Sequence, residues 1–163
     1  MYFACVMTPI GLLGIVFDSF LSVTKIFITD SNKNATIPEF ALNFVKQLNS
    51  YFKGELLEFN YPVNIQNISE FDKKVLEVTC EIPYGQTVTY KWLAKKLNTS
   101  PRAIGQALKR NPLPIIIPCH RVIKSDGKLG GYSLGIEIKR WLIEHEKSIL
   151  YKFQLMKLHH RML

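Results

Sequence analysis

The chain has 163 residues, of which 47% are hydrophobic and 21% charged, and its formal net charge is +8 at pH 7. These values exclude an intrinsically disordered protein and fit one domain or two small ones. Cys5, Cys80 and Cys119 are widely spaced and form no disulfide framework or Cys-x-x-Cys motif, which favours a reducing, cytoplasmic location. The apolar N-terminus has no basic region and is interrupted at Pro9-Ile10-Gly11, so we expect two strands around a turn and no signal peptide or membrane anchor.

The first part of the chain predicts a small antiparallel sheet followed by one helix. Three segments separated by turn signals are rich in Val, Ile, Phe and Thr: residues 2–7, 12–18 and 21–29. Residues 38–52 have apolar side chains at helical spacing, and residues 61–68 are extended and polar, as in a linker with room for one short strand. We therefore predict two domains, residues 1–67 and 68–163.

The second part predicts mainly helices. Ser69 begins a capping-box-like sequence, and Ser100-Pro101 is a good N-cap and first-residue pair for another helix, over residues 102–110. A short basic helix over residues 90–97 precedes it, with Trp92, Leu93 and Leu97 expected to face inward. Two short helices joined by a tight turn suggest a helix-turn-helix, although the same pattern occurs in many proteins that never bind DNA.

A last helix is predicted from about residue 136 to residue 147. Its buried face is expected to carry Ile138, Trp141, Leu142 and His145. We expect Lys139, Arg140 and Glu144 to lie elsewhere on the helix. Residues 148–163 alternate apolar and basic side chains, and they either extend this helix or form a further one.

Positive charge is concentrated in one part of the sequence. No Asp or Glu occurs between Ile82 and Lys124, a window that holds eight Lys and Arg residues. A run of cations is usually a solvated face, but an acid-free window around a candidate nucleophile favours a surface that binds a polyanion. We therefore expect nucleic acid as a partner.

The segment from Asn111 to Val122 contains the clearest candidate for chemistry. Three consecutive isoleucines predict a short buried strand or core segment, which the next proline ends. Cys119 follows this proline directly and is flanked by His120 and Arg121. Neighbouring cations would lower the pKa of the thiol and favour the nucleophilic thiolate. The alternative is a buried structural cysteine, because free cysteines are often buried.

The sequence Pro-Cys-His-Arg-Val, preceded by Arg102-Ala-Ile-Gly105 and Asn111-Pro112, resembles the O6-alkylguanine-DNA alkyltransferases, also called methylated-DNA–protein-cysteine methyltransferases. The resemblance is densest from Phe71 to Glu146. It implies an α+β fold. A small α/β domain with an antiparallel, ribonuclease-H-like sheet would precede a mainly helical domain with a winged-helix-like helix-turn-helix.

The resemblance also implies an activity. The protein would be a DNA repair enzyme that flips O6-alkylguanine out of duplex DNA and transfers the alkyl group to its own Cys119, irreversibly and stoichiometrically. It would act as a monomer on the minor groove, with little sequence specificity and no cofactor. Some family members bind a structural zinc in the first domain, but this chain lacks the Cys and His ligands, so we expect no metal.

Residue roles follow from the resemblance, position by position. Cys119 would be the nucleophile, His120 its base through a water molecule, and Glu146 the residue that orients His120. Residues matching the substrate-binding positions are Tyr90, Asn111, Pro114, Val122 and Ser133. Residues matching the DNA-binding helix are Arg102, Ala103, Gly105, Gln106 and Arg110. The small residues of this helix suit close backbone approach to the minor groove better than base readout. Arg102 would fill the gap left by the flipped base.

One departure concerns the cavity rim. Leu134 stands where the family usually has glycine, and we expect it to narrow the cavity and slow the reaction of benzyl-sized groups. Three other functions remain open at this point. They are an alkyltransferase-like damage sensor, although such sensors lack the cysteine, a basic helix-turn-helix regulator with a structural Cys119, and a Cys-His hydrolase, for which no oxyanion-hole motif is visible.

Overall fold

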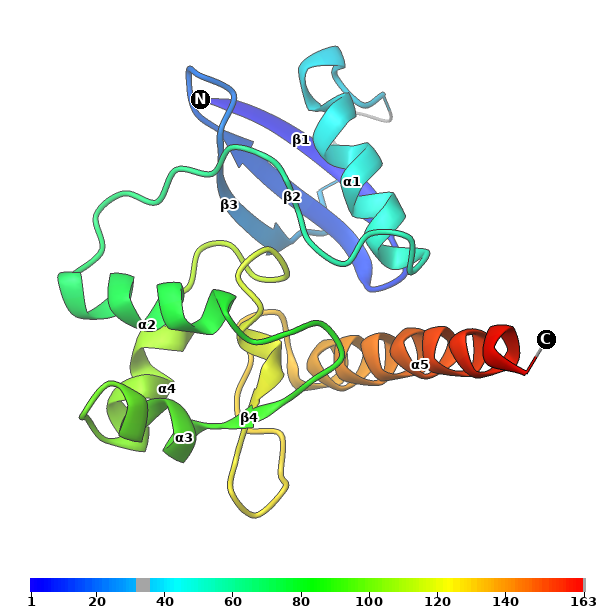
Figure 1. The fold of residues 1–163 in the computed structure, drawn as a ribbon. Helices are drawn as coiled ribbons and strands as arrows, with labels where there is room; N and C mark the ends of the chain where they lie inside the picture. The colour runs from blue at the N-terminus through cyan, green and yellow to red at the C-terminus, as the bar shows by residue number, and fades with distance from the viewer. Residues whose placement is uncertain (32–35, 163) are drawn as a thin grey trace.

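The computed structural model describes residues 1–31 and 36–162. Its first layer is an antiparallel meander of β1 (Tyr2–Thr8), β2 (Gly11–Phe17) and β3 (Val23–Ile28), in the order β1-β2-β3. A 3-10 turn (Glu39–Ala41) leads into α1 (Leu42–Phe52), which lies along the sheet (Figure 1). The ring of Phe17 holds the two together, 5.4 Å from Phe40 and 6.1 Å from Phe44 between ring centres. The predicted sheet and helix are therefore present.

Three helices form the second layer: α2 (Glu70–Cys80), α3 (Tyr90–Lys96) and α4 (Pro101–Lys109). Each begins at a hydroxyl side chain that accepts a backbone N–H of the first turn: Ser69, Thr89 and Ser100 at 3.0, 3.0 and 3.1 Å. The predicted helix pair is thus present, with α3 and α4 joined by a four-residue turn. Trp92 was expected to face inward, but it is 45% exposed, with the ammonium of Lys96 lying 5.0 Å from its ring centre.

The isoleucine segment is a compact core segment, not a strand. Ile115 has a positive φ of 80°, and a single bridge joins Pro114 to Ile117. A 3-10 turn (Cys119–Arg121) follows and leads into β5 (Val122–Ile123), which pairs in parallel with β4 (Val88–Thr89). The predicted end of the packed element just before the cysteine is therefore observed.

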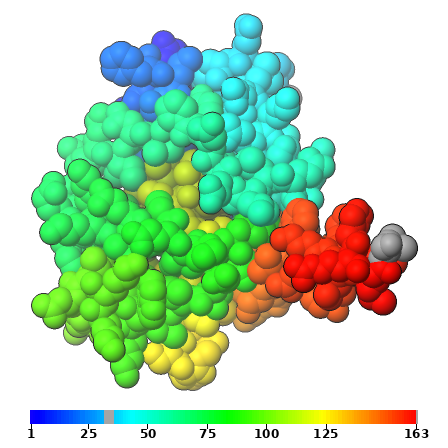
Figure 2. Space-filling view, viewed as in Figure 1, coloured from blue at the N-terminus to red at the C-terminus, as the bar shows by residue number. Residues whose placement is uncertain are grey.

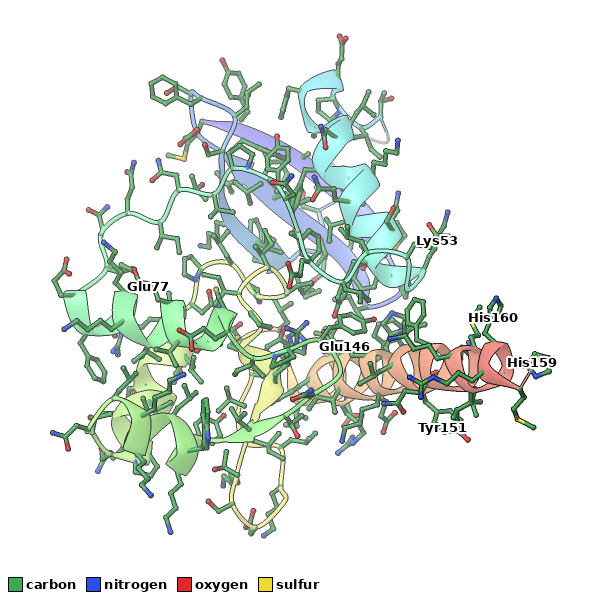
Figure 3. The ribbon with its side chains drawn as sticks, viewed as in Figure 1. Lys53, Glu77, Glu146, Tyr151, His159 and His160 are labelled. Atoms are coloured by element: carbon green, nitrogen blue, oxygen red, sulfur yellow. The ribbon has the colours of Figure 1, made fainter. Side chains whose placement is uncertain are left out.

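The last helix, α5 (Ile136–Arg161), is continuous, so residues 148–161 extend it. Its end projects from the body of the protein (Figures 1 and 2). Figure 3 shows Tyr151, His159 and His160 on this projecting end, whereas Glu146 lies within the body. No helix in residues 1–31 or 36–162 has the length and apolar character needed to cross a membrane.

The first layer contacts the rest of the chain closely. Buried apolar residues from both parts form one cluster, and Ile26 N–H of β3 donates to the carbonyl of Pro112 at 2.9 Å. The ring of Phe52 in α1 lies 5.9 Å from Trp141 of α5. The division at residues 67 and 68 stays a prediction. The sheet layer lies against the segment that carries Asn111 and Cys119.

Candidate active site

A cavity of about 760 Å³ lies between α4, the start of α3 and the loop after β5. Its walls include six residues predicted for the site: Tyr90, Arg102, Gly105, Gln106, Cys119 and Ser133. Lys91, Lys109 and Lys124 also line it, so the opening carries positive charge. A cysteine in such a cavity can reach a bound base, while the cations suit a phosphate backbone.

Asn111 holds the cysteine segment in place. Its Oδ1 accepts the N–H of Leu113 at 2.9 Å, and its Nδ2 donates to the carbonyl of Ile117 at 3.1 Å and to Cys119 Sγ at 3.2 Å. The side chain is buried, so these bonds do not compete with bulk water. Asn111 therefore fixes both the loop and the direction of the sulfur.

The thiol differs from the expectation based on its neighbours. Burial raises the pKa of Cys119, while the amide of Asn111 and the charge of Lys139 lower it by less. Arg121 was expected to stabilise the thiolate, but its guanidinium is directed away, to Glu146 and to the carbonyl of Ile82 at 2.7 Å. Cys119 is therefore a thiol at neutral pH and needs a base to become a nucleophile.

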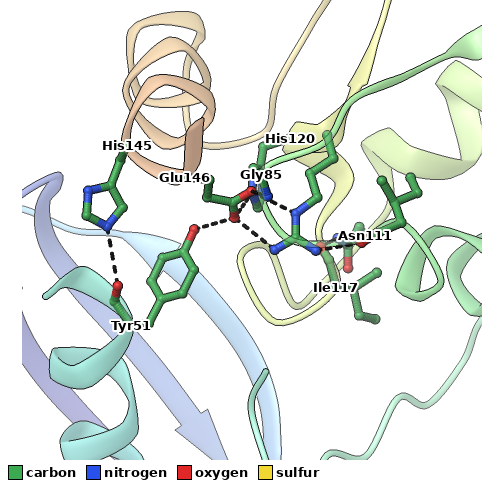
Figure 4. A network of polar contacts seen from close by, with 9 residues as sticks. Tyr51, Gly85, Asn111, Ile117, His120, His145 and Glu146 are labelled. Carbon is green, nitrogen blue, oxygen red and sulfur yellow. Dashed lines mark hydrogen bonds and ion pairs between the residues drawn. The ribbon is translucent and has the colours of Figure 1, made fainter. Parts of the chain in front are cut away.

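A base is present in the next residue. His120 is fully buried, and its Nε2 lies 2.7 Å from Glu146 Oε1 (Figure 4). Burial would raise the pKa of Glu146, but the hydrogen bonds and charges of His120 and Arg121 hold it well below its usual range. The ionised carboxylate can only accept, so Nε2 carries the proton and Nδ1 of the neutral ring is free to take one.

His120 is suited to that role. Burial lowers its pKa, which the hydrogen bond and charge of Glu146 partly offset, so the ring is neutral at physiological pH. Its Nδ1 has no hydrogen-bond partner among residues 1–31 and 36–162. A neutral imidazole with an unengaged nitrogen is a competent general base.

Glu146 is the centre of a buried network. Its two oxygens accept from five donors at 2.7–3.2 Å: Tyr51 Oη, His120 Nε2, Arg121 Nε, Arg121 Nη2 and the N–H of Gly85. Only 1% of the residue is exposed. Sequence reasoning placed Glu146 in the site from its match to a motif, and the structure shows why a carboxylate is tolerated there.

Lys139 belongs to the site, although hydrophobic periodicity does not point to it. It was expected off the buried face of α5, but it is fully buried. Its ammonium donates to the carbonyls of Val122, Leu129 and Gly131 at 2.6, 2.6 and 3.1 Å, and to Tyr90 Oη at 3.3 Å. Burial lowers its pKa to about 8, against a smaller opposing effect of Cys119.

The expected buried face of α5 was offset by one position. The buried residues are Lys139, Leu142, Ile143 and Glu146, which follow an i, i+3, i+4, i+7 spacing. Ile138, Trp141 and His145 are only partly buried. The true face carries two charged residues, and for that reason hydrophobic periodicity did not reveal it. Allowing buried charge at helical spacing would have found both Lys139 and Glu146.

Tyr90 lies at the inner wall of the cavity. Burial raises its pKa, so its hydroxyl is a proton donor, and Lys139 lies beneath it. Gly130 packs directly on this hydroxyl: it has a φ of +74°, and a Cβ there would lie 2.8 Å from Tyr90 Oη. A glycine is therefore needed at this position for the loop to close against Tyr90.

The predicted DNA contacts lie in two different settings. Arg102 and Gln106 are exposed on α4 at the cavity, and Gly105 leaves its wall open. Ala103 is partly exposed on α4 but does not line the cavity. Arg110 instead forms a two-pronged ion pair with the buried Asp72, at 2.7 and 2.8 Å. This pair joins α4 to α2, so the guanidinium of Arg110 is engaged within the protein.

Three further predictions concern positions behind or beside the cavity. Pro114 and Val122 are buried and do not line it, although the carbonyl of Val122 is held by Lys139. Leu134 was expected to narrow the rim, but it packs against the core and is not among the lining residues. The structure therefore offers no steric reason for Leu134 to slow the reaction of large alkyl groups.

Comparisons with known proteins agree with this geometry. Residues 70–148 match the family model described as 6-O-methylguanine DNA methyltransferase, DNA binding domain. The methylated-DNA–protein-cysteine methyltransferase of Methanosarcina mazei is 38% identical over 92% of this chain and 99% of its own length. The corresponding protein of Methanocaldococcus jannaschii is 52% identical, but this alignment covers 56% of this chain and only 54% of the relative, so the chain spans about half of it.

A solved structure extends the match to the fold. The OGT of Mycobacterium tuberculosis, crystallised in complex with DNA, superposes with a TM-score of 0.80 and is 35% identical over 91% of this chain and 94% of that one. The chain thus combines the fold of this OGT with Cys119 at the cavity and the buried pair of His120 and Glu146 behind it. The chain belongs to the methylated-DNA–protein-cysteine methyltransferase family.

Proposed function

We propose that the protein repairs O6-alkylguanine in duplex DNA by moving the alkyl group to Cys119. The observation that carries the proposal is the cysteine in a cationic cavity, backed by a buried histidine–carboxylate pair. The three cysteines are free, and this reaction requires Cys119 as a reduced thiol, which a reducing cytoplasm would maintain. We expect α4 to enter the minor groove of the DNA, where its small residues would allow the helix backbone to approach closely.

The proposed reaction is a direct displacement. The thiol proton of Cys119 passes through a water molecule to His120 Nδ1, while Sγ attacks the alkyl carbon. The bond from that carbon to O6 breaks, and guanine leaves as its oxyanion or enol, with donors from Tyr90 Oη and the N–H of Ser133. The carbonyl of Cys119, a residue that lines the cavity, would accept from the exocyclic amine. Alkylated Cys119 is a thioether, whose thiolate is a poor leaving group. The transfer is therefore irreversible, and each protein molecule reacts once.

A titration tests this proposal. Duplex DNA with one O6-methylguanine is added in molar excess, and restored guanine is measured by chromatography of the digested DNA. We expect repair to stop when one guanine per protein molecule has been restored. Continued turnover would contradict the stoichiometric reaction. A complete absence of repair would contradict the activity itself.

Replacing Arg102 tests the proposed entry of α4 into DNA. Flipping a base out of the duplex costs a few kcal/mol of base stacking, and Arg102 is proposed to recover part of this by filling the gap. Arg102→Ala should therefore slow transfer from duplex DNA by about one to two orders of magnitude. Transfer from the free base O6-methylguanine should stay unchanged. Lys95→Ala, an exposed change on α3 that does not line the cavity, is the matched control. Equal slowing on both substrates would contradict a role in flipping.

A further inference from the structure

The first layer, formed by the sheet and α1, contributes one side chain to the hydrogen-bond network around Glu146. Tyr51 of α1 is 1% exposed, and its hydroxyl donates to Glu146 Oε1 at 2.7 Å, the same oxygen that accepts from His120 Nε2. The carbonyl of Tyr51 is bound in turn by His145 Nε2 at 3.3 Å. Figure 4 shows Tyr51 approaching Glu146 from the side opposite Asn111. The first 67 residues therefore contact the proposed catalytic residues directly.

We infer that Tyr51 is a positioning residue for alkyl transfer, acting through Glu146 on His120. The inference rests on the proposed function and deepens it, because it gives the first layer a part in the chemistry. Tyr51 is one of five donors to the carboxylate, and the only donor that comes from residues 1–67 among the hydrogen bonds of the described chain.

The physical basis is competition for the charge of Glu146. Each donor withdraws part of the negative charge that would otherwise favour a proton on the adjacent imidazole. Without the Tyr51 hydroxyl the carboxylate is a stronger acceptor, so it stabilises the imidazolium form of His120 more strongly. A His120 that stays protonated to higher pH cannot accept the thiol proton from Cys119 until the pH rises further.

Other charged and titratable groups face this pair and are unchanged in the proposed experiment. Cys119 and Arg121 lie in the 3-10 turn, Tyr84 in the segment between α2 and β4, Tyr132 in the loop after β5, and Lys139 in α5. Burial, followed by the charge of Glu146, raises the pKa of Tyr51 well above its ordinary value. Its hydroxyl is therefore a donor throughout the pH range in which His120 titrates.

The structure supplies a matched control. Tyr84 is also buried, its ring centre lies 6.0 Å from that of Tyr51, and its ring faces Arg121. Unlike Tyr51, its hydroxyl has no hydrogen-bond partner among the described residues. Tyr51→Phe and Tyr84→Phe each remove one buried oxygen and keep the ring, but only the first removes a bond to Glu146.

The test is the single-turnover rate of transfer as a function of pH, from mildly acid to mildly alkaline conditions. In Tyr51→Phe the acid side of the profile should move to higher pH by roughly half to one unit, the size expected for one lost hydrogen bond. The alkaline plateau should stay within about twofold of wild type, as follows from a change in protonation alone. Tyr84→Phe should follow the wild-type profile throughout.

Two results would overturn the inference. One is a Tyr51→Phe profile with an unmoved acid side, and the other is an equal loss of rate at every pH, which indicates only structural damage. A nuclear magnetic resonance titration of the His120 ring in Cys119→Ser, with and without Tyr51→Phe, gives the same answer without any transfer. Absence of transfer in wild type would refute the proposed function. The titration would then test by itself whether Tyr51 affects the protonation of His120.

Discussion

Glu146→Gln is expected to lower the free energy of unfolding by about 3–5 kcal/mol, the usual cost of removing one partner of a buried ion pair. The amide keeps the shape of the carboxylate but leaves the buried guanidinium of Arg121 without its counter-charge. Transfer should also slow, by about a hundredfold to ten-thousandfold, because His120 loses the group that orients it and stabilises its protonated form. Urea denaturation and single-turnover kinetics measure the two effects.

The stability effect has a defined pH dependence. The folded pKa of Glu146 is depressed, so its contribution is present above the ordinary pKa of a glutamate and is lost as the pH falls below it. The difference between wild type and Glu146→Gln should therefore narrow in acid. Glu144→Gln, an exposed change on the same helix, is the control and should alter neither quantity measurably. A Glu146→Gln protein as stable and as fast as this control would contradict the network described.

Lys139→Met is expected to destabilise the protein by about 3 kcal/mol or more, because each buried acceptor left without a donor costs about 1–3 kcal/mol. The three carbonyls that Lys139 binds come from β5 and the loop that follows it. Without Lys139 this loop, which forms the cavity wall beside Tyr90, is no longer held in place. We expect transfer to slow by about tenfold or more for the same reason, since misplacement of a reacting group by an ångström is costly.

The neighbouring residue provides the comparison for this prediction. Arg140 is exposed, and among residues 1–31 and 36–162 it pairs only with Glu137 on the helix surface, at 2.8 Å. Arg140→Met should change the free energy of unfolding by less than about 0.5 kcal/mol, as for most surface pairs. Thermal and urea denaturation of the two variants measure the contrast. Similar losses in both would contradict the assignment of Lys139 to the site.

Local features of the fold could be predicted from the sequence because their causes are local. Ser69 and Ser100 cap the helices that follow them, since a hydroxyl before a helical segment satisfies its first N–H groups. Pro118 ends the isoleucine segment, and the motif around Cys119 locates the candidate nucleophile. The short helix pair followed from the same kinds of signal.

Features that depend on tertiary contacts could not be predicted in the same way. Lys139 is buried because three distant carbonyls converge on it, and no pattern along α5 encodes their position. Tyr51 reads as one more apolar residue of α1, yet its hydroxyl lies beside a residue 95 positions later. Burial raises the pKa of Cys119, and the guanidinium of the adjacent Arg121 is directed to Glu146 and Ile82 instead of to the thiol; sequence adjacency determines neither.

The central claim, that Cys119 receives the alkyl group, is tested most directly by mass spectrometry. The protein is mixed with duplex DNA carrying one O6-methylguanine, digested and analysed peptide by peptide, beside Cys119→Ser. The structure predicts that wild type gains one methyl group in place of a hydrogen on the peptide containing Cys119, and that the variant gains none. A methyl group found on Cys5 or Cys80, or an unmodified protein after guanine has been restored, would contradict the account.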